Sequence, residues 1–419
     1  MPDTGLLPDA ALQAPACAGR VVVVGLGYVG LPIALEAAAA GFDVTGFDLD
    51  PTAAAGAEAA WRGRGAPGRF AATAEAARLP AAETWLICVP TPLDAVGRPD
   101  LSMVEAALAT CIAGLVPGGL VCLVSTCQPG ATNGLCRRAI EAAGFVVGRD
   151  AFLAVSPERE NPGAAVGPRL VPRLLGAPDP ASLARARAFW ERIADHLVPV
   201  ASPEIAECAK LLENTYRLVN IALMDELHRG FAALGVPTRA VVEAAATKPF
   251  GFAPFWPGAG AGGHCIPVDP AYLQMELARV GAPSAVLAAA AAANAARPAQ
   301  ILAALEAALG GSVQQRRVLV LGVTYKPEVP DLRGAAPIAL LRALAARGAR
   351  PAWCDPVLGP RHPPELAGLP RAERTAGGWD AVVLGTPHRA FDLAAVPALA
   401  PLVLDPFGLL PAGPSVRVV

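Results

Sequence analysis

The chain has 419 residues, 54% of them hydrophobic and 17% charged, and a formal net charge of -2. This length exceeds what one hydrophobic core usually serves, so two or three domains are expected. The near-neutral charge, with no run of Lys and Arg among aromatic residues, argues against nucleic-acid binding. The longest uncharged run, residues 106–136, is split by Pro117-Gly118-Gly119 into a helix-like and a strand-like piece, which favours a buried α/β unit over a membrane span.

The N-terminal sequence and the cysteines point to a cytoplasmic protein. The opening MPDTGLLPDA carries Asp3 and Asp9 and lacks the positive start of a signal peptide, and residues 1–18 are expected to form a flexible tail. Nine cysteines without paired metal-type spacing are typical of reduced thiols. The five histidines are scattered, so no metal site is expected.

Short apolar runs alternate with alanine-rich helical stretches after residue 19. The predicted strands lie in VVVVGLG, FDVTGFDLD, TWLICVPT and LVCLVST, and later in RRVLVLGV, RPAWCD, WDAVVLGT and PLVLDP. This alternation predicts parallel sheets covered by helices. Between the two blocks, residues of about 202–297 show helical periodicity, broken by the long loop GFAPFWPGAGAGGHCIPVDP. The fold class is therefore α/β, with two Rossmann-like doubly wound parallel-sheet domains (19–200 and 301–419) joined by a central helical domain with a long helix (201–300).

A dinucleotide-binding pattern follows the first strand. Gly25, Gly27 and Gly30 form G-x-G-x-x-G at the opening of a helix, and Asp48 ends the next strand. The glycines permit a tight turn, close approach of a pyrophosphate to backbone amides, and close packing of helix on strand. Asp48 is placed to accept from the ribose hydroxyls, which favours NAD over NADP because a carboxylate repels a 2′-phosphate.

The second block has only Gly322 at its first turn, followed by Tyr325-Lys326-Pro327 and Asp331-Leu332-Arg333. A Lys and an Arg at the carboxyl end of a parallel strand suit a phosphate-bearing ligand. The alternative is a solvated turn in which Arg333 pairs with Asp331.

Cys265 lies in the glycine-rich stretch Gly262-Gly263-His264-Cys265-Ile266-Pro267, where backbone amides can converge on a bound group. That setting is typical of a nucleophile, whereas Cys88, Cys111 and Cys122 stand in apolar segments and are expected in the core. Taken alone, Cys265 is equally compatible with a small core residue.

Two further sites are open to a catalytic and a structural interpretation. Lys210 and Asn214 are spaced i, i+4 on one helix face and either point into one cleft or form a surface pair. Glu158 follows a strand and is either a carboxylate for acid–base chemistry or half of a surface pair with Arg159.

Eight motifs resemble, in this order from residue 25 to about 334, the UDP-glucose/GDP-mannose dehydrogenase family. They are GLGYVGLP, CVPTPLD, VSTCQPGATN, SPERENPG, AKLLENTYRLVNIALMDEL, TKPFGF, PGAGAGGHCIPVDP and LGVTYKPEVPDLRG. The wording of SPERENPG and TKPFGF is closest to the branch acting on UDP-N-acetylhexosamines. The resemblance implies an NAD domain at 19–200, a central dimerisation domain with the Cys loop at 201–300, and a UDP-sugar domain at 301–419.

The resemblance also assigns site residues. The NAD site would be lined by Gly25, Leu26, Gly27, Tyr28, Val29, Gly30, Asp48, Pro90, Thr91 and Thr126, with Arg333 from the second α/β domain. The nucleotide sugar would be held by Glu158, Arg159, Lys210, Asn214, Trp256, Gly258, Gly260, Gly262, Tyr325 and Lys326. The catalytic set would be Cys265, Lys210, Asn214, Glu158, Asp269 and Thr126.

The implied reaction is a four-electron oxidation of a sugar C6 alcohol to a carboxylate in a homodimer. Cys265 would trap the aldehyde and later carry a thioester, Lys210 and Asn214 would stabilise the oxyanion, Asp269 would orient the oxyanion or a water, and Glu158 would serve as base.

Three features depart from the family pattern and leave alternatives open, one of them being that PTAAAGAE after Asp50 lacks the basic residue often found near the adenosine. Phe407 stands where the family usually has an Arg near the nucleotide, and Pro162 replaces an expected second carboxylate. The alternatives are a UDP-glucose dehydrogenase, a two-electron enzyme of the hydroxyacid-dehydrogenase type, and a catalytically silent nucleotide-sugar sensor.

Overall fold

The computed structural model describes residues 19–159, 168–360, 362–373 and 377–419. The predicted tail over 1–18 and the position of Pro162 lie outside the described residues. The chain divides into two compact units, one made of residues 1–94 and 99–210 and the other of 95–98 and 211–419. The division into three domains stays a prediction.

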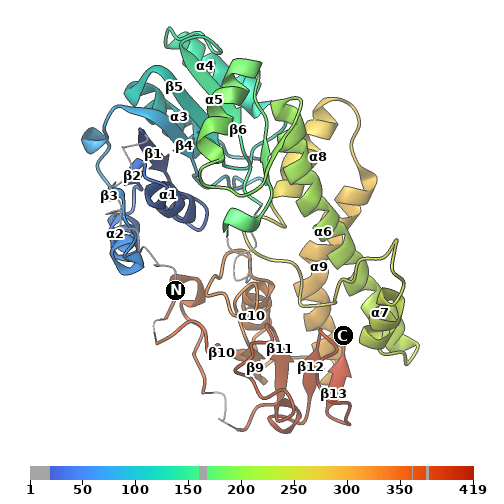
Figure 1. Ribbon diagram of the computed structural model, residues 1–419. Helices are drawn as coiled ribbons and strands as arrows, with labels where there is room; N and C mark the ends of the chain where they lie inside the picture. Colours follow the sequence, from blue (N-terminus) through green and yellow to red (C-terminus); the bar gives the residue numbers. More distant parts are fainter. Residues whose placement is uncertain (1–18, 160–167, 361, 374–376) are drawn as a thin grey trace, which may run out of the picture. The chain divides into compact units, whose positions relative to one another are not determined.

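The first unit is built on a six-stranded sheet in the order β3-β2-β1-β4-β5-β6, and every neighbouring pair is parallel (Figure 1). Its strands are β1 (Arg20–Val24), β2 (Asp43–Phe47), β3 (Arg69–Thr73), β4 (Ala82–Ile87), β5 (Leu115–Leu123) and β6 (Ala151–Val155). The central strands are apolar runs because helices cover both faces of the sheet. This strand order is that of the dinucleotide-binding Rossmann fold.

Helices pack on the two faces of this sheet as separate sets. The first face carries α1 (Gly30–Ala39), α2 (Pro51–Arg64) and α5 (Pro180–Trp190), and the second carries α3 (Ser102–Gly114) and α4 (Arg137–Ala142). The remaining elements are short: η1 (Ala76–Arg78), the π-helix η2 (Thr132–Cys136), η3 (Pro168–Leu170), and the strands β7 (Arg173–Leu175) and β8 (Leu197–Pro199), which pair in parallel.

The long helix α6 (Pro203–Ala233) has 31 residues and continues from the first unit into the second. The second unit also holds α7 (Thr238–Ala246), α8 (Asp269–Arg279) and α9 (Ala285–Ala308). Between α7 and α8 runs the long loop that the sequence predicts. Because α9 extends to Ala308 and continues through Pro298, the boundary predicted at residue 300 falls within a helix.

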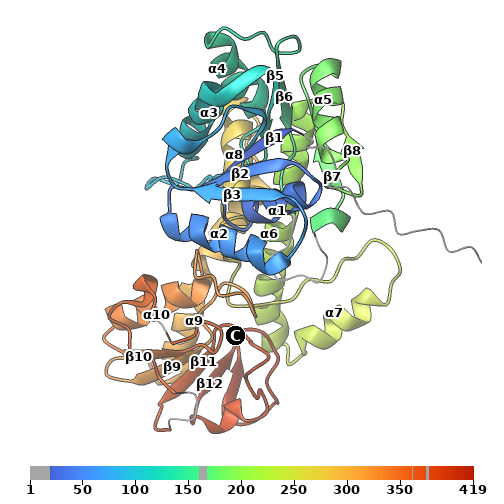
Figure 2. The ribbon, with the colours of Figure 1, turned by 60° about the vertical axis from the view of Figure 1, so that its left-hand side comes forward.

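The second unit ends in a five-stranded parallel sheet in the order β10-β9-β11-β12-β13. The strands are β9 (Arg317–Leu321), β10 (Arg350–Cys354), β11 (Ala381–Leu384), β12 (Val403–Asp405) and β13 (Val416–Val418). One face is covered by α9, α10 (Ala336–Ala346) and η4 (Pro364–Leu366), and the other by η5 (Val396–Ala398) and loops (Figure 2).

The predicted fold class is confirmed by both parallel sheets and their helices. The sequence did not predict β3, β7, β8 or β13. The strands β7, β8 and β13 have only three residues each, and β3 lies at a sheet edge. Over the described residues, no helix has the length and apolar character needed to cross a bilayer.

Candidate active site

The glycine turn after β1 has the geometry of a phosphate cradle. Gly25 has φ of 93°, and a Cβ there would lie 2.5 Å from the carbonyl oxygen of Cys88, so only glycine fits. A Cβ at Gly30 would lie 1.8 Å from the Gly25 carbonyl oxygen, whereas one at Gly27 would meet nothing within 4 Å of the described residues. The space at Gly27 and the absence of acidic residues from the first turn of α1 leave the helix amides open to an anion.

Asp48 stabilises this turn. Its Oδ2 accepts from the Leu26 amide at 2.8 Å and its Oδ1 accepts from the Asp50 amide at 3.0 Å. The half-buried carboxylate is thereby fixed at the end of β2, next to the glycine turn, where a ribose would lie.

Three predicted cofactor residues follow neighbouring strands at the same edge of the sheet. Pro90 and Thr91 come after β4, and Thr126 comes after β5, which pairs with β4. Ser125 joins the two segments, because its hydroxyl donates to the Val89 carbonyl at 2.7 Å. The predicted residues from Gly25 to Thr126 therefore meet at the carboxyl ends of β1, β4 and β5.

Glu158, after β6, is held in a buried ion pair that the sequence did not signal. Its Oε2 accepts from Arg173 Nη2 at 2.8 Å, and its Oε1 accepts from the Arg159 amide at 2.7 Å. The Arg173 guanidinium also lies 4.4 Å from the centre of the Trp190 ring. Arg173 stands fifteen residues further along, on β7, and nothing local in the sequence links it to Glu158.

The start of α6 is hydrogen-bonded to the segment that follows Thr126. The Glu207 carboxylate accepts from the Gly130 amide at 2.6 Å and from the Thr132 amide and hydroxyl at 2.9 and 2.6 Å. Burial raises the pKa of Glu207, and these donors oppose the shift. Lys210 is buried one turn further along α6, so the same helix that carries the predicted cation also fixes the turn into the π-helix η2.

In the second unit, Asn214 and Asp269 meet beside the Cys265 loop. Asn214 Nδ2 donates to Asp269 Oδ2 at 2.5 Å, and both side chains are buried. The Asp269 amide donates to the Cys265 carbonyl oxygen at 2.9 Å, so Asp269 opens α8 directly over the loop. Cys265 itself is partly exposed and not in a disulfide. The structure thus brings together three of the predicted catalytic residues.

The loop before Cys265 is held at two peptides by side chains from the helices. Asn294 on α9 accepts from the Ala261 amide at 2.7 Å and donates to the Ala261 carbonyl at 3.0 Å. Asp225 on α6 accepts from the Gly258 amide at 2.7 Å, and Arg297 Nε donates to the Gly258 carbonyl at 3.0 Å. No sequence pattern marks these three side chains, because only their contacts distinguish them from other helix positions.

Two titratable side chains on α6 near Gly258, Asp225 and His228, have shifted pKa values. Burial raises the pKa of Asp225 to about 6, although Arg297 and the Gly258 amide favour the carboxylate. Burial also lowers the pKa of His228, one turn further on α6, to about 4.

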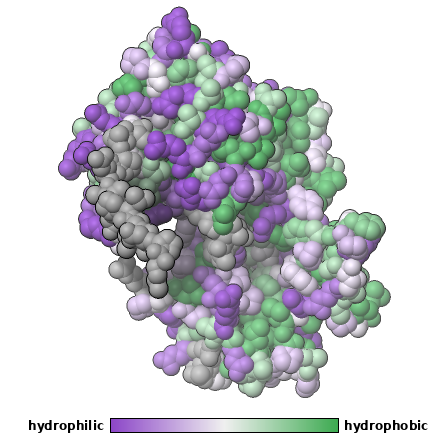
Figure 3. Space-filling view, viewed as in Figure 1, coloured by the Kyte–Doolittle hydropathy of each residue, from purple (hydrophilic) through white to green (hydrophobic). Residues whose placement is uncertain are grey.

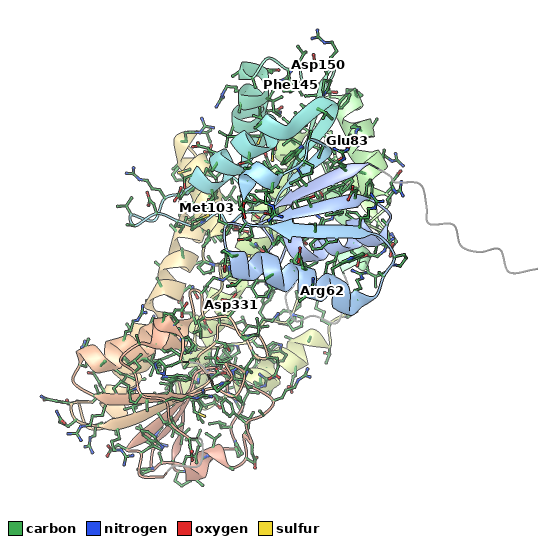
Figure 4. The ribbon with its side chains drawn as sticks, turned by 90° about the vertical axis from the view of Figure 1, so that its left-hand side faces the viewer. Arg62, Glu83, Met103, Phe145, Asp150 and Asp331 are labelled. Carbon is green, nitrogen blue, oxygen red and sulfur yellow. The ribbon has the colours of Figure 1, made fainter. Side chains whose placement is uncertain are left out.

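The turn after β9 docks on the same loop. A Cβ at Gly262 would lie 2.7 Å from the Gly334 carbonyl oxygen and 2.9 Å from the Tyr325 Cβ, and the Gly263 amide donates to the Arg333 carbonyl at 2.9 Å. The Arg333 guanidinium pairs with Asp331, labelled in Figure 4, at 2.6 Å, which is the pairing that the sequence left open. Burial and the charge of Arg217 lower the pKa of Lys326.

Two aromatic residues border the loop. Trp256 is 38% exposed and lies under the Arg239 guanidinium, 4.3 Å from ring centre to Cζ. A Cβ on Gly258 would lie 3.2 Å from Phe407 Cε1, so Phe407 packs against the loop where the family pattern has an Arg. Asp405 fixes the Phe407 segment by accepting from the amides of Phe407, Leu409 and Leu410 at 2.9, 2.7 and 2.6 Å.

The cysteines expected in the core are there. Cys88, Cys111 and Cys122 are buried, and burial raises the pKa of all three thiols, that of Cys122 to about 12. Among the described residues, no group of three or more His, Cys, Asp and Glu is arranged to hold a metal ion.

Comparison with known proteins matches the chain in three consecutive parts. Residues 19–194 match the NAD binding domain of the UDP-glucose/GDP-mannose dehydrogenase family, 204–296 its central domain and 319–410 its UDP binding domain. A UDP-N-acetyl-D-glucosamine 6-dehydrogenase of Pseudomonas aeruginosa is 33% identical over 395 residues, which are 89% of this chain and 91% of the relative. The chain belongs to the UDP-glucose/GDP-mannose dehydrogenase family.

Solved structures agree with this membership. A UDP-D-ManNAc dehydrogenase from Pyrococcus horikoshii matches with a TM-score of 0.82 and 25% identity, over 95% of this chain and 98% of that one. A UDP-glucose dehydrogenase from Pyrobaculum islandicum matches with a TM-score of 0.81 and 26% identity, over 96% of each chain. The protein is therefore an NAD-dependent oxidoreductase of the nucleotide-sugar dehydrogenase type, and the hydroxyacid-dehydrogenase alternative is set aside.

Proposed function

We propose that this dehydrogenase oxidises the C6 alcohol of a UDP-N-acetylhexosamine to the carboxylate in two steps, through a covalent intermediate on Cys265, and that it does so in the cytoplasm. Both the Pseudomonas aeruginosa relative and the Pyrococcus horikoshii structure carry names of enzymes acting on UDP-N-acetylhexosamines. NAD, when bound at the Gly25–Asp48 turn, takes up one hydride in each oxidation. All other parts of the reaction are assigned to side chains.

The observation that carries the proposal is the Asn214–Asp269 pair joined to the backbone of Cys265. In the proposed course the C6 carbon of the alcohol first loses a hydride and its hydroxyl proton passes to water, which gives the aldehyde. The Cys265 thiolate then adds to the aldehyde carbon, and the carbonyl oxygen becomes an oxyanion. The Lys210 ammonium and the Asn214 amide, one turn apart on α6, supply charge and a hydrogen bond to that oxygen. Loss of the second hydride leaves a thioester on the sulfur.

Hydrolysis of the thioester needs a base for water, and we assign that role to Glu158. Arg173 keeps this carboxylate in place within a buried setting, which is what a general base requires. Water adds to the thioester carbonyl, the C–S bond breaks, and the Cys265 thiol and the uronate are released.

The decisive experiment counts NADH formed per sugar over a panel of UDP- and GDP-sugars with NAD or NADP. Two NADH per uronate are expected with NAD and a UDP-N-acetylhexosamine. Cys265→Ala should abolish uronate formation while leaving NAD and sugar binding intact, and Cys208→Ala, at an exposed cysteine, is the matched control. A normal uronate yield from Cys265→Ala would refute the covalent route.

Lys210→Ala separates the oxyanion role from binding. Turnover should fall by about 10²- to 10³-fold, the cost of one lost donor to a developing oxyanion. An unchanged rate would remove Lys210 from the mechanism.

We also propose a homodimer formed along α6. Leu212, Tyr216, Leu223 and Leu227 are exposed large apolar residues at spacings that place them along one face of this helix. The part of Figure 3 where Figure 1 draws α6 and α8 is largely hydrophobic. Leu223→Glu should convert a dimer to a monomer in light scattering, whereas a dimer that persists would contradict this interface.

A further inference from the structure

A hollow in the second unit lies at the opposite end of the strands of its sheet from the Cys265 loop. It has a volume of about 460 Å³ and is lined by Arg317, Ala345, Ala349, Arg350, Pro351, Ala352, Gly368, Leu369, Pro370, Arg371, Ala372 and Trp379. We call it the basal pocket. Arg317 and Arg350 are register partners that start β9 and β10, whereas Lys326 and Tyr325 follow the carboxyl end of β9. The basal pocket is therefore separate from the candidate active site.

The three arginines of the basal pocket are held in place by neutral groups. Arg350 donates twice to Gln315 Oε1, at 2.9 and 2.5 Å, and Arg371 donates to the carbonyl oxygens of Gly359 and Asp355. The Arg317 guanidinium lies 4.9 Å from the centre of the Trp379 ring. Within the described part of the chain, none of the three has an ion-pair partner within 4.0 Å.

The corresponding end of the first unit's sheet has a smaller hollow that also contains arginines. That hollow, of about 250 Å³, has Arg20, Arg185 and Arg192 in its lining but also Glu83, labelled in Figure 4. Glu83 accepts from the Arg20 amide at 2.8 Å. No acidic residue lines the basal pocket. Asp380, next to Trp379 in the chain, accepts from the Arg317 amide and pairs with Arg316, and the charge of Arg317 also helps to lower its pKa.

These features fit a phosphorylated ligand. Guanidinium groups that are hydrogen-bonded or stacked in position, with no carboxylate in direct contact, bind phosphate with little loss of side-chain entropy, and their forked geometry matches phosphate oxygens. The volume falls in the range of about 300–1,000 Å³ found for small-molecule sites. Leu369, Pro351 and the buried Trp379 add an apolar wall against which a ring can be desolvated. We propose that the basal pocket binds a small phosphorylated compound that carries a ring, at a site apart from the reaction.

The test is the number of UDP molecules bound per chain in equilibrium dialysis, with inorganic pyrophosphate as a second probe. The unaltered protein should bind two UDP, one at each site, and Arg350→Ala/Arg371→Ala should bind one. Arg342→Ala, an exposed arginine on α10 outside the pocket, should still bind two. Pyrophosphate should bind the basal pocket at least tenfold more weakly than UDP, because it has no ring.

The single variant Arg350→Ala serves as a control in case the double variant fails to fold. In the described structure the Arg350 side chain is hydrogen-bonded only to Gln315. The single variant should weaken the second UDP at least tenfold with an unchanged melting temperature. Lys326→Ala alters the proposed substrate site, so this variant should lose the UDP bound there and keep the UDP in the basal pocket. If the proposed substrate site fails, the protein binds one UDP that Arg350→Ala/Arg371→Ala removes. If that double variant binds UDP as the unaltered protein does, the basal pocket is not a ligand site.

Discussion

The two parallel sheets begin with the same turn and use it differently. Gly25 after β1 and Gly322 after β9 both have positive φ, of 93° and 80°. A Cβ on either would collide with a carbonyl oxygen after the neighbouring strand, Cys88 at 2.5 Å and Thr386 at 2.1 Å. In the first unit α1 then starts at Gly30, whereas in the second α10 starts only at Ala336, after a loop that carries Lys326 and docks on the Cys265 loop.

The acids of the two turns show the same contrast. Asp48 after β2 accepts from the Leu26 amide, and Asp355 after β10 accepts from the equivalent Val323 amide, each at 2.8 Å. Asp355 is 1% exposed and also accepts from His388 Nε2 at 3.0 Å, while Asp48 is only half-buried. Equivalent backbone positions thus leave one carboxylate partly exposed and bury the other within the fold.

Adding a methyl group at Gly27 of the first turn and at Gly262 of the Cys265 loop, on which the second turn docks, should produce the largest difference. Gly262→Ala would press a Cβ against the Gly334 carbonyl and Tyr325, so the Cys265 loop must move. Turnover should fall by about 10²-fold, as expected for a misplacement near 1 Å. Gly27→Ala meets open space, so it should leave the melting temperature unchanged and raise only the KM for NAD. Equal stability losses in both variants would contradict the comparison.

The two acids can be compared by alanine substitution. Asp355→Ala leaves the buried Val323 amide and His388 without their acceptor and should cost roughly 2–4 kcal/mol of unfolding free energy. Burial would raise the pKa of Asp355, but hydrogen bonds from His388 and Val323 lower it, so its stabilisation is present above the unfolded pKa and lost as pH falls through the folded one.

Asp48→Ala should instead change cofactor use. We expect a smaller stability loss than for Asp355→Ala and reduced discrimination against NADP, measured as the ratio of kcat/KM for the two cofactors. If Asp355→Ala rather than Asp48→Ala changed that ratio, the functional assignment of the two acids would be reversed.

The two hydrogen bonds between Asn294 and the Ala261 peptide should position the Cys265 loop, and substitution of Asn294 tests this. Asn294→Ala removes one acceptor and one donor and should lower kcat/KM by about tenfold, the effect of roughly 1.4 kcal/mol, with NAD binding unchanged. Asn294→Asp keeps the acceptor for the Ala261 amide and should recover part of the loss. Alkylation of Cys265 by iodoacetamide would report the loop directly, and an unaltered alkylation rate in Asn294→Ala would argue against a positioning role.

The smallest expected effect is on the pH dependence of stability, to which Asp225 and His228 near Gly258 contribute in opposite directions. Because the folded pKa of Asp225 is raised to about 6, its contribution to stability is present below its unfolded pKa and lost as pH rises through about 6. Because that of His228 is lowered to about 4, its contribution is present above its unfolded pKa and lost as pH falls through about 4.

Single substitutions should separate these opposed contributions. Between pH 4.5 and 7, the stability of Asp225→Asn should fall on acidification, and that of His228→Asn should rise. Urea unfolding at several pH values measures both slopes. Parallel slopes in the two variants would show that these groups do not titrate as described.

The local patterns in the sequence determined the strands β1, β2, β4 and β5, the glycine turn with Asp48, and the long loop before α8, because periodicity, glycine spacing and chain proximity encode them. The resemblance supplied Asn214 and Asp269 as catalytic candidates, and their contact at 2.5 Å came only with the fold. The short edge strands β3 and β13 left no pattern strong enough to predict.

Only the tertiary structure decided which side chains support the site. Arg173 binds Glu158 from another strand, Asn294 and Arg297 reach the Cys265 loop from α9, and His388 closes on Asp355 after β11. These partners are 15 to 39 residues apart along the chain. Burial and hydrogen-bond geometry depend on where the backbone brings distant segments together, and a local residue pattern carries no record of that.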